Sequence, residues 1–314
     1  MIQRSTRSYR FILQAGLLLG FVLVCTSSAF SQQRVQFSQY MFNGLIINPA
    51  YAGAEEALSL TLMHRMQWTG IDGAPVTQTL SGHSLFRKKS MGLGFSLVND
   101  KIGVHKNLTA MGSYAYHLPV SNSSWLSFGL QAGIHNRKSD YASLYDGSGN
   151  DPLVSASGLT QTSFDMGTGV YFRSPRLHVG LSAPELLPEK SVVNDSLTVH
   201  WDNTTWFLFS KYIITLNDHI NLEPGLLVKY FPDTPISIDV NLNAVFYDAV
   251  SFGLSYRKDE SVDFLLRAKV TPQFQFGYAY DYPTGEIPKT AGGSHELMLN
   301  YRFRYAYTKV DSPR

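Results

Sequence analysis

Hydrophobic and polar residues alternate along most of the chain, from Glu56 onward. In one stretch, Phe274, Phe276 and Tyr278 are separated by Gln275 and Gly277. Successive side chains of a β-strand point to opposite faces, so this period of two predicts strands with one apolar and one polar face. An amphipathic helix would instead repeat its apolar residues about every 3.6 positions. The pattern therefore predicts an all-β fold.

The alternation predicts fourteen strands. They are expected at about 56–68, 74–85, 90–99, 105–118, 123–138, 161–173, 176–184, 201–215, 219–231, 235–247, 249–257, 261–270, 273–282 and 294–304. A soluble β-sandwich would also alternate, so the length of the strands matters. Several reach about ten residues or more, whereas strands of globular proteins average about five or six and tilted membrane-crossing strands need about nine to eleven.

The expected connections are unequal in length. The longest, 139–160, 185–200 and 283–293, follow the fifth, seventh and thirteenth strands, whereas connections after even-numbered strands are tight. Outer-membrane barrels have short periplasmic turns and long exterior loops, and their even strand number keeps both chain ends on one side. The chain is therefore predicted to be a transmembrane antiparallel β-barrel of about 14 strands, located in the outer membrane.

Composition agrees with this interpretation. Of the 314 residues only 16% are charged and 13% are aromatic, whereas roughly 25% are charged in an average soluble protein. Such a chain is too apolar to be disordered. After the first 30 residues, no apolar run approaches the roughly 18 residues of a membrane-spanning helix.

The amino terminus has the pattern of a secretion signal. Arg4, Arg7 and Arg10 precede an apolar stretch that ends at Val24, and small residues follow. We expect residues 1–31 to be removed as a signal peptide. The only cysteine, Cys25, lies in this segment, so the mature chain has neither disulfides nor thiol-based zinc sites. It keeps 23 basic and 24 acidic residues, without the basic excess of a nucleic-acid-binding protein.

Residues 32–55 do not alternate, and Pro49 and Gly53 interrupt them. We expect an ordered segment that either plugs the barrel or lies at its periplasmic mouth. A purely structural plug and a surface for partner contact both fit this stretch. The predicted barrel itself comprises residues 56–305, and residues 306–314 form a short carboxy-terminal tail.

Two strings in the amino-terminal segment carry a resemblance. Residues 37–43 read FSQYMFN, and residues 48–53 read NPAYAG. Further matching positions are Arg65, Gln67, Trp68, Gly70, Gly73, Ala74, Pro75, Thr77, Gly92, Leu93, Gly94, Asp100, Gly103, His295, Glu296, Leu297, Tyr301, Arg302 and Phe303. Together they make the chain resemble the PorP/SprF family of type IX secretion membrane proteins along nearly its whole mature length.

The resemblance implies an outer-membrane component of the type IX secretion system of Bacteroidota. Family members are associated with periplasmic ring lipoproteins, with gliding motility, and with secreted proteins that carry a type IX C-terminal sorting domain, such as adhesins. On this basis the chain is expected to assist secretion or cell-surface anchoring of a cognate protein. The candidate partner-binding residues are Phe37, Gln39, Tyr40, Phe42, Asn43, Asn48, Pro49 and Tyr51.

No catalytic, cofactor or metal site is expected. The serine motif G-x-S-x-G does not occur, and His295-Glu296 lacks a second histidine because Leu299 stands there. Asp146 begins a stretch like a calcium loop, but the twelfth position is Ser157, which favours a flexible loop. The alternatives to a role in secretion or anchoring are a passive pore or small-solute transporter, and a barrel hydrolase.

Overall fold

The computed structural model describes residues 35–55, 57–86, 90–141, 159–187, 192–193, 196–197, 204–231, 234–285 and 292–303. All of them belong to one compact unit, Val35–Arg314. The predicted signal peptide 1–31, the predicted tail 306–314 and the loop that contains Asp146 lie outside the described residues.

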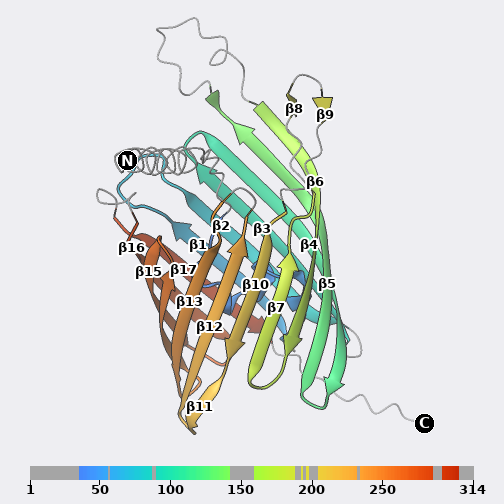
Figure 1. Ribbon diagram of the computed structural model, residues 1–314, viewed down its shortest axis with the longest axis vertical. Coiled ribbons are helices and arrows are strands. Elements are labelled where there is room, and N and C mark those ends of the chain that lie inside the picture. Colours follow the sequence, from blue (N-terminus) through green and yellow to red (C-terminus); the bar gives the residue numbers. More distant parts are fainter. Residues whose placement is uncertain are drawn as a thin grey trace, which may run out of the picture. The chain divides into compact units, whose positions relative to one another are not determined.

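A closed antiparallel barrel of fourteen strands forms the body of the protein (Figure 1). Its strands are β1 (Leu58–Met66), β2 (Val76–Phe86), β3 (Met91–Ile102), β4 (His105–Ser121), β5 (Ser124–Ser139), β6 (Leu159–Arg173), β7 (Leu177–Ala183), β10 (Trp206–Tyr212) continued by β11 (Ile214–Asn217), β12 (Ile220–Tyr230), β13 (Ser237–Phe246), β14 (Val250–Arg257), β15 (Ser261–Lys269), β16 (Phe274–Pro283) and β17 (Ser294–Phe303). Pairing of β1 with β17, and of β10 with both β7 and β12, closes the ring. The short strands β8 (Val192–Val193) and β9 (Ser196–Leu197) pair only with each other.

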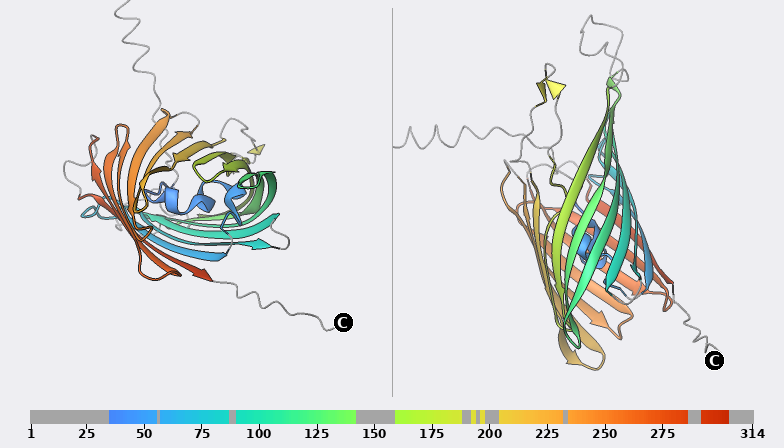
Figure 2. Two further views of the ribbon diagram at one scale, coloured as in Figure 1. Left: turned by 90° about the horizontal axis from the view of Figure 1, so that it is seen from below. Right: turned by 90° about the vertical axis from the view of Figure 1, so that its right-hand side faces the viewer.

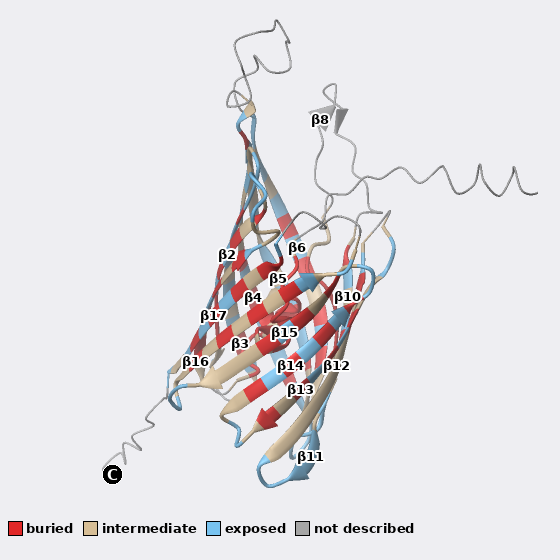
Figure 3. Ribbon diagram, turned by 90° about the vertical axis from the view of Figure 1, so that its left-hand side faces the viewer, coloured by how far each residue is buried: buried red, intermediate tan, exposed pale blue. Residues whose placement is uncertain are grey.

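The alternation of the sequence corresponds to the two faces of the barrel wall. On β14 the side chains of Ser251 and Ser255 are buried on the inside, whereas Phe252 and Leu254 are exposed on the outside. Figure 3 shows the same alternation of buried and exposed positions along the other strands. An apolar outer surface and a polar interior are what a barrel embedded in lipid requires. The predicted fold class is confirmed.

The connections follow the predicted parity. Residues 140–158, 184–205 and 284–293 link strands at one end of the barrel, which we call the loop end. The connections after β2, β4, β6, β11, β13 and β15 are short and lie at the opposite end, which we call the turn end. In outer-membrane barrels long loops face the exterior and short turns face the periplasm.

Several strand bounds differ from those predicted. The strand expected at 201–215 begins at Trp206 among the described residues and is interrupted at Ile213, which separates β10 from β11. Strands β4, β5 and β6 are longer than expected, at 17, 16 and 15 residues. At about 3.3 Å per residue, β4 extends about 56 Å, well beyond the hydrocarbon layer. No helix in the described ranges is long and apolar enough to cross a membrane.

A plugged lumen as the candidate functional site

The lumen of the barrel is filled by residues 35–55, which we call the plug (Figure 2). It contains three turns of 3-10 helix: η1 (Tyr40–Phe42), η2 (Gly44–Ile46) and η3 (Pro49–Tyr51). Most of its side chains are buried, and the apolar ones pack against inward-facing residues of the wall. The plug therefore obtains its hydrophobic core from the barrel.

The local sequence explains the last turn of the plug. The Asn48 side chain accepts a hydrogen bond from the Ala50 amide at 2.9 Å and so caps η3. Pro49 occupies the first helical position, where a missing N–H costs nothing. Gly53 then adopts a φ of 76°, which a residue with a Cβ rarely tolerates. The NPAYAG string is thus a cap, a helical turn and a chain reversal.

The plug begins near the loop end and finishes at the turn end. Gln36 accepts a hydrogen bond from Lys229, which lies next to the last residue of β12. At the other extreme, the Ala54 carbonyl accepts a hydrogen bond from Arg173, the last residue of β6. Glu55 pairs with Arg302 at 2.8 Å, near the end of β17. The plug therefore runs through the lumen from one end to the other.

A buried ion cluster holds the first part of the plug. Arg65 pairs with Asp281 at 2.7 Å and with Glu296 at 3.1 Å. The two carboxylate oxygens of Glu296 accept hydrogen bonds from the amides of Ser38 and Gln39, each at 2.9 Å. The Ser38 hydroxyl donates to Asp281 at 2.8 Å. Because buried charges are stable only when paired and hydrogen-bonded, plug and cluster depend on each other.

A second ion cluster lies beside the first on β12 to β15. Asp239 pairs with Lys229 at 3.0 Å and with Arg257 at 3.1 Å. Arg257 also faces Asp263, at 3.8 Å. The neighbouring Asn241 donates a hydrogen bond to the hydroxyl of Tyr40 at 2.8 Å. These polar groups line the wall behind η1 and give its buried tyrosine a partner.

Inward-facing glycines provide the space for the rest of the plug. A Cβ at Gly129 would collide with the backbone of Pro49 and Ala50. A Cβ at Gly169 would collide with the side chain of Asn48, and one at Gly92 with the Ala52 carbonyl. The backbone of the NPAYAG string can therefore lie directly on the wall only because these positions lack side chains.

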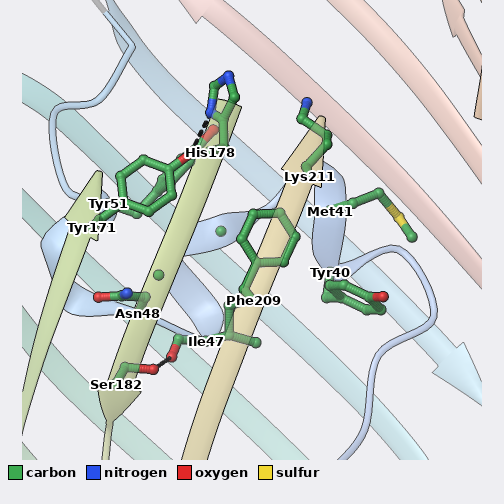
Figure 4. A pocket seen from close by; sticks show the side chains of 12 residues that line it. Tyr40, Met41, Ile47, Asn48, Tyr51, Tyr171, His178, Ser182, Phe209 and Lys211 are labelled. Carbon is green, nitrogen blue, oxygen red and sulfur yellow. Dashed lines mark hydrogen bonds between the residues drawn. The ribbon is translucent and has the colours of Figure 1, made fainter. Parts of the chain in front are cut away.

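A cavity lies between the plug and strands β6, β7 and β10 (Figure 4). It measures about 50 Å³ and is lined by both apolar and polar side chains, among them Phe209, His178 and Lys211. The hydroxyl of Tyr171 is hydrogen-bonded to His178 at 2.7 Å, and the hydroxyl of Ser182 donates to the Ile47 carbonyl. A volume of this size accommodates a few water molecules.

The comparisons with known proteins bear on this arrangement. The family model described as "Type IX secretion system membrane protein PorP/SprF" matches residues 29–301. The chain belongs to the PorP/SprF family. This confirms the resemblance carried by the two amino-terminal strings and places the barrel in the outer membrane. Among curated proteins, no relative matches this PorP/SprF chain.

Solved structures share the fold of this PorP/SprF barrel at low identity. The CymD monoaromatic hydrocarbon channel aligns with a TM-score of 0.54 and 14% identity, covering 84% of this chain and 93% of that one. A TodX monoaromatic hydrocarbon channel variant aligns with a TM-score of 0.50 and 10% identity, covering 83% and 94%. Likeness at this level shows a common barrel architecture.

The structure brings the candidate partner-binding residues of this PorP/SprF chain together inside the lumen. Phe37, Gln39, Tyr40, Asn43, Asn48 and Pro49 are buried, and Phe42 and Tyr51 are half-buried. Arg267 lies over the ring of Phe42, and the rings of Tyr51 and Tyr171 meet edge to face. Every one of these residues thus contacts plug or wall. Their role in partner binding stays a prediction.

Sequence reasoning missed the two wall acids that hold the first part of the plug. In the sequence, Glu296 stands out only as part of the His295-Glu296-Leu297 match, and no motif singles out Asp281. Both are inward-facing acids near the loop end of their strands, and an acid at a buried lumen position requires a cation or a donor as partner. That requirement is the signal that would have singled them out.

Proposed function

We propose that this PorP/SprF barrel is a non-enzymatic outer-membrane component that assists secretion or cell-surface anchoring of one cognate secreted protein, such as an adhesin. The observation that supports this role best is the filled lumen. A transport pore requires a continuous aqueous path, whereas here the plug is buried from Gln36 to Ala54 with few exceptions. A barrel without free edges and with an immobilised interior is well suited to anchor another protein.

In this proposal, the two ends of the barrel have different partners. The connections at the loop end hold the exported protein, which carries a type IX C-terminal sorting domain. The turns and the final part of the plug, near Glu55, contact the periplasmic ring lipoproteins. The buried residues Phe37 to Tyr51 support this contact from inside, because they fix where the plug emerges at the turn end.

The proposal is tested by affinity purification of the tagged barrel from outer membranes in mild detergent, followed by mass spectrometry. We expect a large secreted protein with a type IX sorting domain, with or without ring lipoproteins. The control is an unrelated outer-membrane barrel that carries the same tag. Deletion of the gene should leave the same secreted protein in the periplasm or in the medium. Normal surface display of every type IX substrate in the deletion strain would refute the role.

The alternative role, a passive pore or small-solute transporter, is distinguished by conductance. The purified barrel in a planar bilayer should be silent at neutral pH if it is an anchor. Stable open channels of the intact protein would favour the pore and would make the plug a movable element. Hydrolase activity is tested separately with lipase and protease substrates, and we expect none.

A further inference from the structure

A group of metal-ligating side chains lies on the wall at the loop end, away from both ion clusters. His135 of β5, Asp165 of β6 and Glu185, which follows β7, each offer a ligand atom within 4.8 Å of those of the other two. They come from three different segments of the chain. The regular pairing of β7 with β6 ends at Ala183, opposite Thr168, and the next backbone bond between the two segments is from the Leu186 amide to the Met166 carbonyl, at 2.7 Å.

The segment that carries Glu185 turns inward from the wall and is held there. The side-chain amide of Gln131, on β5, donates to the Pro184 carbonyl at 2.6 Å. The amides of Leu186 and Leu187 donate to Oδ1 of Asp165 at 3.2 and 2.8 Å. Residues 184–187 therefore lie across the inner face of β6, and Glu185 is fixed beside Asp165 and His135.

The surrounding hydrogen bonds orient the ligands. Oδ1 of Asp165 is occupied by backbone amides, which leaves Oδ2 facing the imidazole of His135. On the other side of that ring, Nδ1 is hydrogen-bonded to the hydroxyl of Thr109 at 2.8 Å. Metal-binding histidines and carboxylates are commonly held by such outer contacts, which fix the ring orientation and the available oxygen.

The distances are compatible with an ion. Nε2 of His135 lies 3.2 Å from Oδ2 of Asp165. Two donors at about 2.1 Å from one ion are about 3.0 Å apart in octahedral coordination and about 3.4 Å apart in tetrahedral coordination. This pair therefore already has the spacing of adjacent ligands. The Glu185 carboxylate offers a third ligand atom within 4.8 Å of the other two.

We propose that His135, Asp165 and Glu185 form a divalent metal site, with zinc as the ion that fits best. Two carboxylates balance the charge of a divalent cation, and an imidazole ligand favours zinc over calcium or magnesium. The ion joins residues 184–187 to β5 and β6. It thereby holds this irregular segment against the wall at the loop end, where the regular ladder between β6 and β7 has ended.

The test is isothermal titration of the full-length barrel, stripped with EDTA in detergent, with zinc chloride. We expect one high-affinity zinc ion per barrel. The variants His135→Ala and Glu185→Gln should each weaken binding at least tenfold. His219→Ala is the matched control, because His219 is exposed in the turn between β11 and β12. This variant should bind zinc with the affinity of the parent protein. Calcium is titrated in parallel and should bind far more weakly.

A second readout tests the structural effect of the ion. Zinc should slow hydrogen exchange of the Leu186 and Leu187 amides at least tenfold in the parent protein and leave it unchanged in Glu185→Gln. The proposal is overturned if the parent protein binds no stoichiometric zinc, or if His135→Ala and Glu185→Gln bind it as tightly as His219→Ala does. Preference for calcium would overturn the choice of ion. Tight binding without added protection would overturn the role of the ion in holding residues 184–187 against the wall.

Discussion

At the scale of single residues, the amino-terminal part of the plug depends on one carboxylate. Glu296 has no exposed surface and accepts hydrogen bonds from two consecutive amides while it pairs with Arg65. The variant Glu296→Gln keeps the shape but removes the charge and one acceptor oxygen. Hydrogen bonds to charged groups contribute about 1.5–3 kcal/mol. We expect hydrogen exchange of the Ser38 and Gln39 amides to become roughly thirtyfold faster, measured by mass spectrometry.

The matched control is Glu223→Gln. Glu223, on β12, pairs within the wall with Lys211 of β10 at 3.3 Å. Exchange at Ser38 and Gln39 should stay at the parental rate in this variant. Equal exchange in both variants would contradict a specific role of Glu296.

Glycine positions in the wall give a second test at this scale. Gly129→Ala places a methyl group against the backbone of Pro49 and Ala50, whereas at Gly112 the nearest atom to an added Cβ is the Ala132 carbonyl oxygen, at 3.9 Å. Overpacking of a filled interior costs about 1–3 kcal/mol. We expect Gly129→Ala to lower the free energy of unfolding in lipid vesicles by this amount. Gly112→Ala should leave it nearly unchanged, and an equal loss in both would contradict the close approach of the plug.

At the scale of elements, the plug and the wall differ in whether each is stable without the other. The strands form a continuous ladder that closes between β1 and β17 without any plug residue. The plug has only three short 3-10 turns, and such turns are not stable without tertiary contacts. The wall therefore determines the conformation of the plug, and the plug determines whether the lumen is open.

Removal of the plug should convert the barrel into a channel. We expect a variant without residues 35–55 to keep its strand content by circular dichroism, because the ladder is intact. The charges around Arg65, Asp239 and Glu296 would then face water, which hydrates them. Single-channel recording in planar bilayers should show stable conductance for this variant and none for the full-length protein. A folded but silent variant would contradict the view that the plug alone blocks the lumen.

The same difference explains what the sequence could predict. The strands were predictable because each lies between lipid and a polar lumen. Apolar and polar residues therefore alternate with a period of two, as along β14. The contacts of the plug were not predictable from the sequence, because they join residues far apart in the chain. Ser38 and Glu296, for example, are 258 positions apart. The sequence around Gly129 also does not show why a glycine is needed there, because the reason is the close approach of the Ala50 backbone. The break at Ile213 has no marker comparable to a glycine or proline.

At the scale of the whole molecule, the direction of the plug has a consequence for topology. The plug enters at the loop end, beside Lys229, and reaches β1 at the turn end, beside Arg302. Because long loops of outer-membrane barrels face the exterior, we expect Val35 to lie toward the cell surface although β1 begins at the periplasmic side. A segment that starts at the exterior is reachable by extracellular proteins, whereas Glu55 is reachable from the periplasm.

This orientation can be measured with single cysteines, because the only native one, Cys25, precedes the described chain. We expect Val35→Cys to react with a membrane-impermeant maleimide in intact cells, since this half-buried residue lies near the exterior mouth. Asp218→Cys, in the exposed turn between β11 and β12, is the matched control and should react only after the outer membrane is permeabilised. The reverse pattern would place the loop end in the periplasm. Reaction of both positions only after permeabilisation would mean that the plug enters from the periplasmic side, and the exterior role of its first residues would then be wrong.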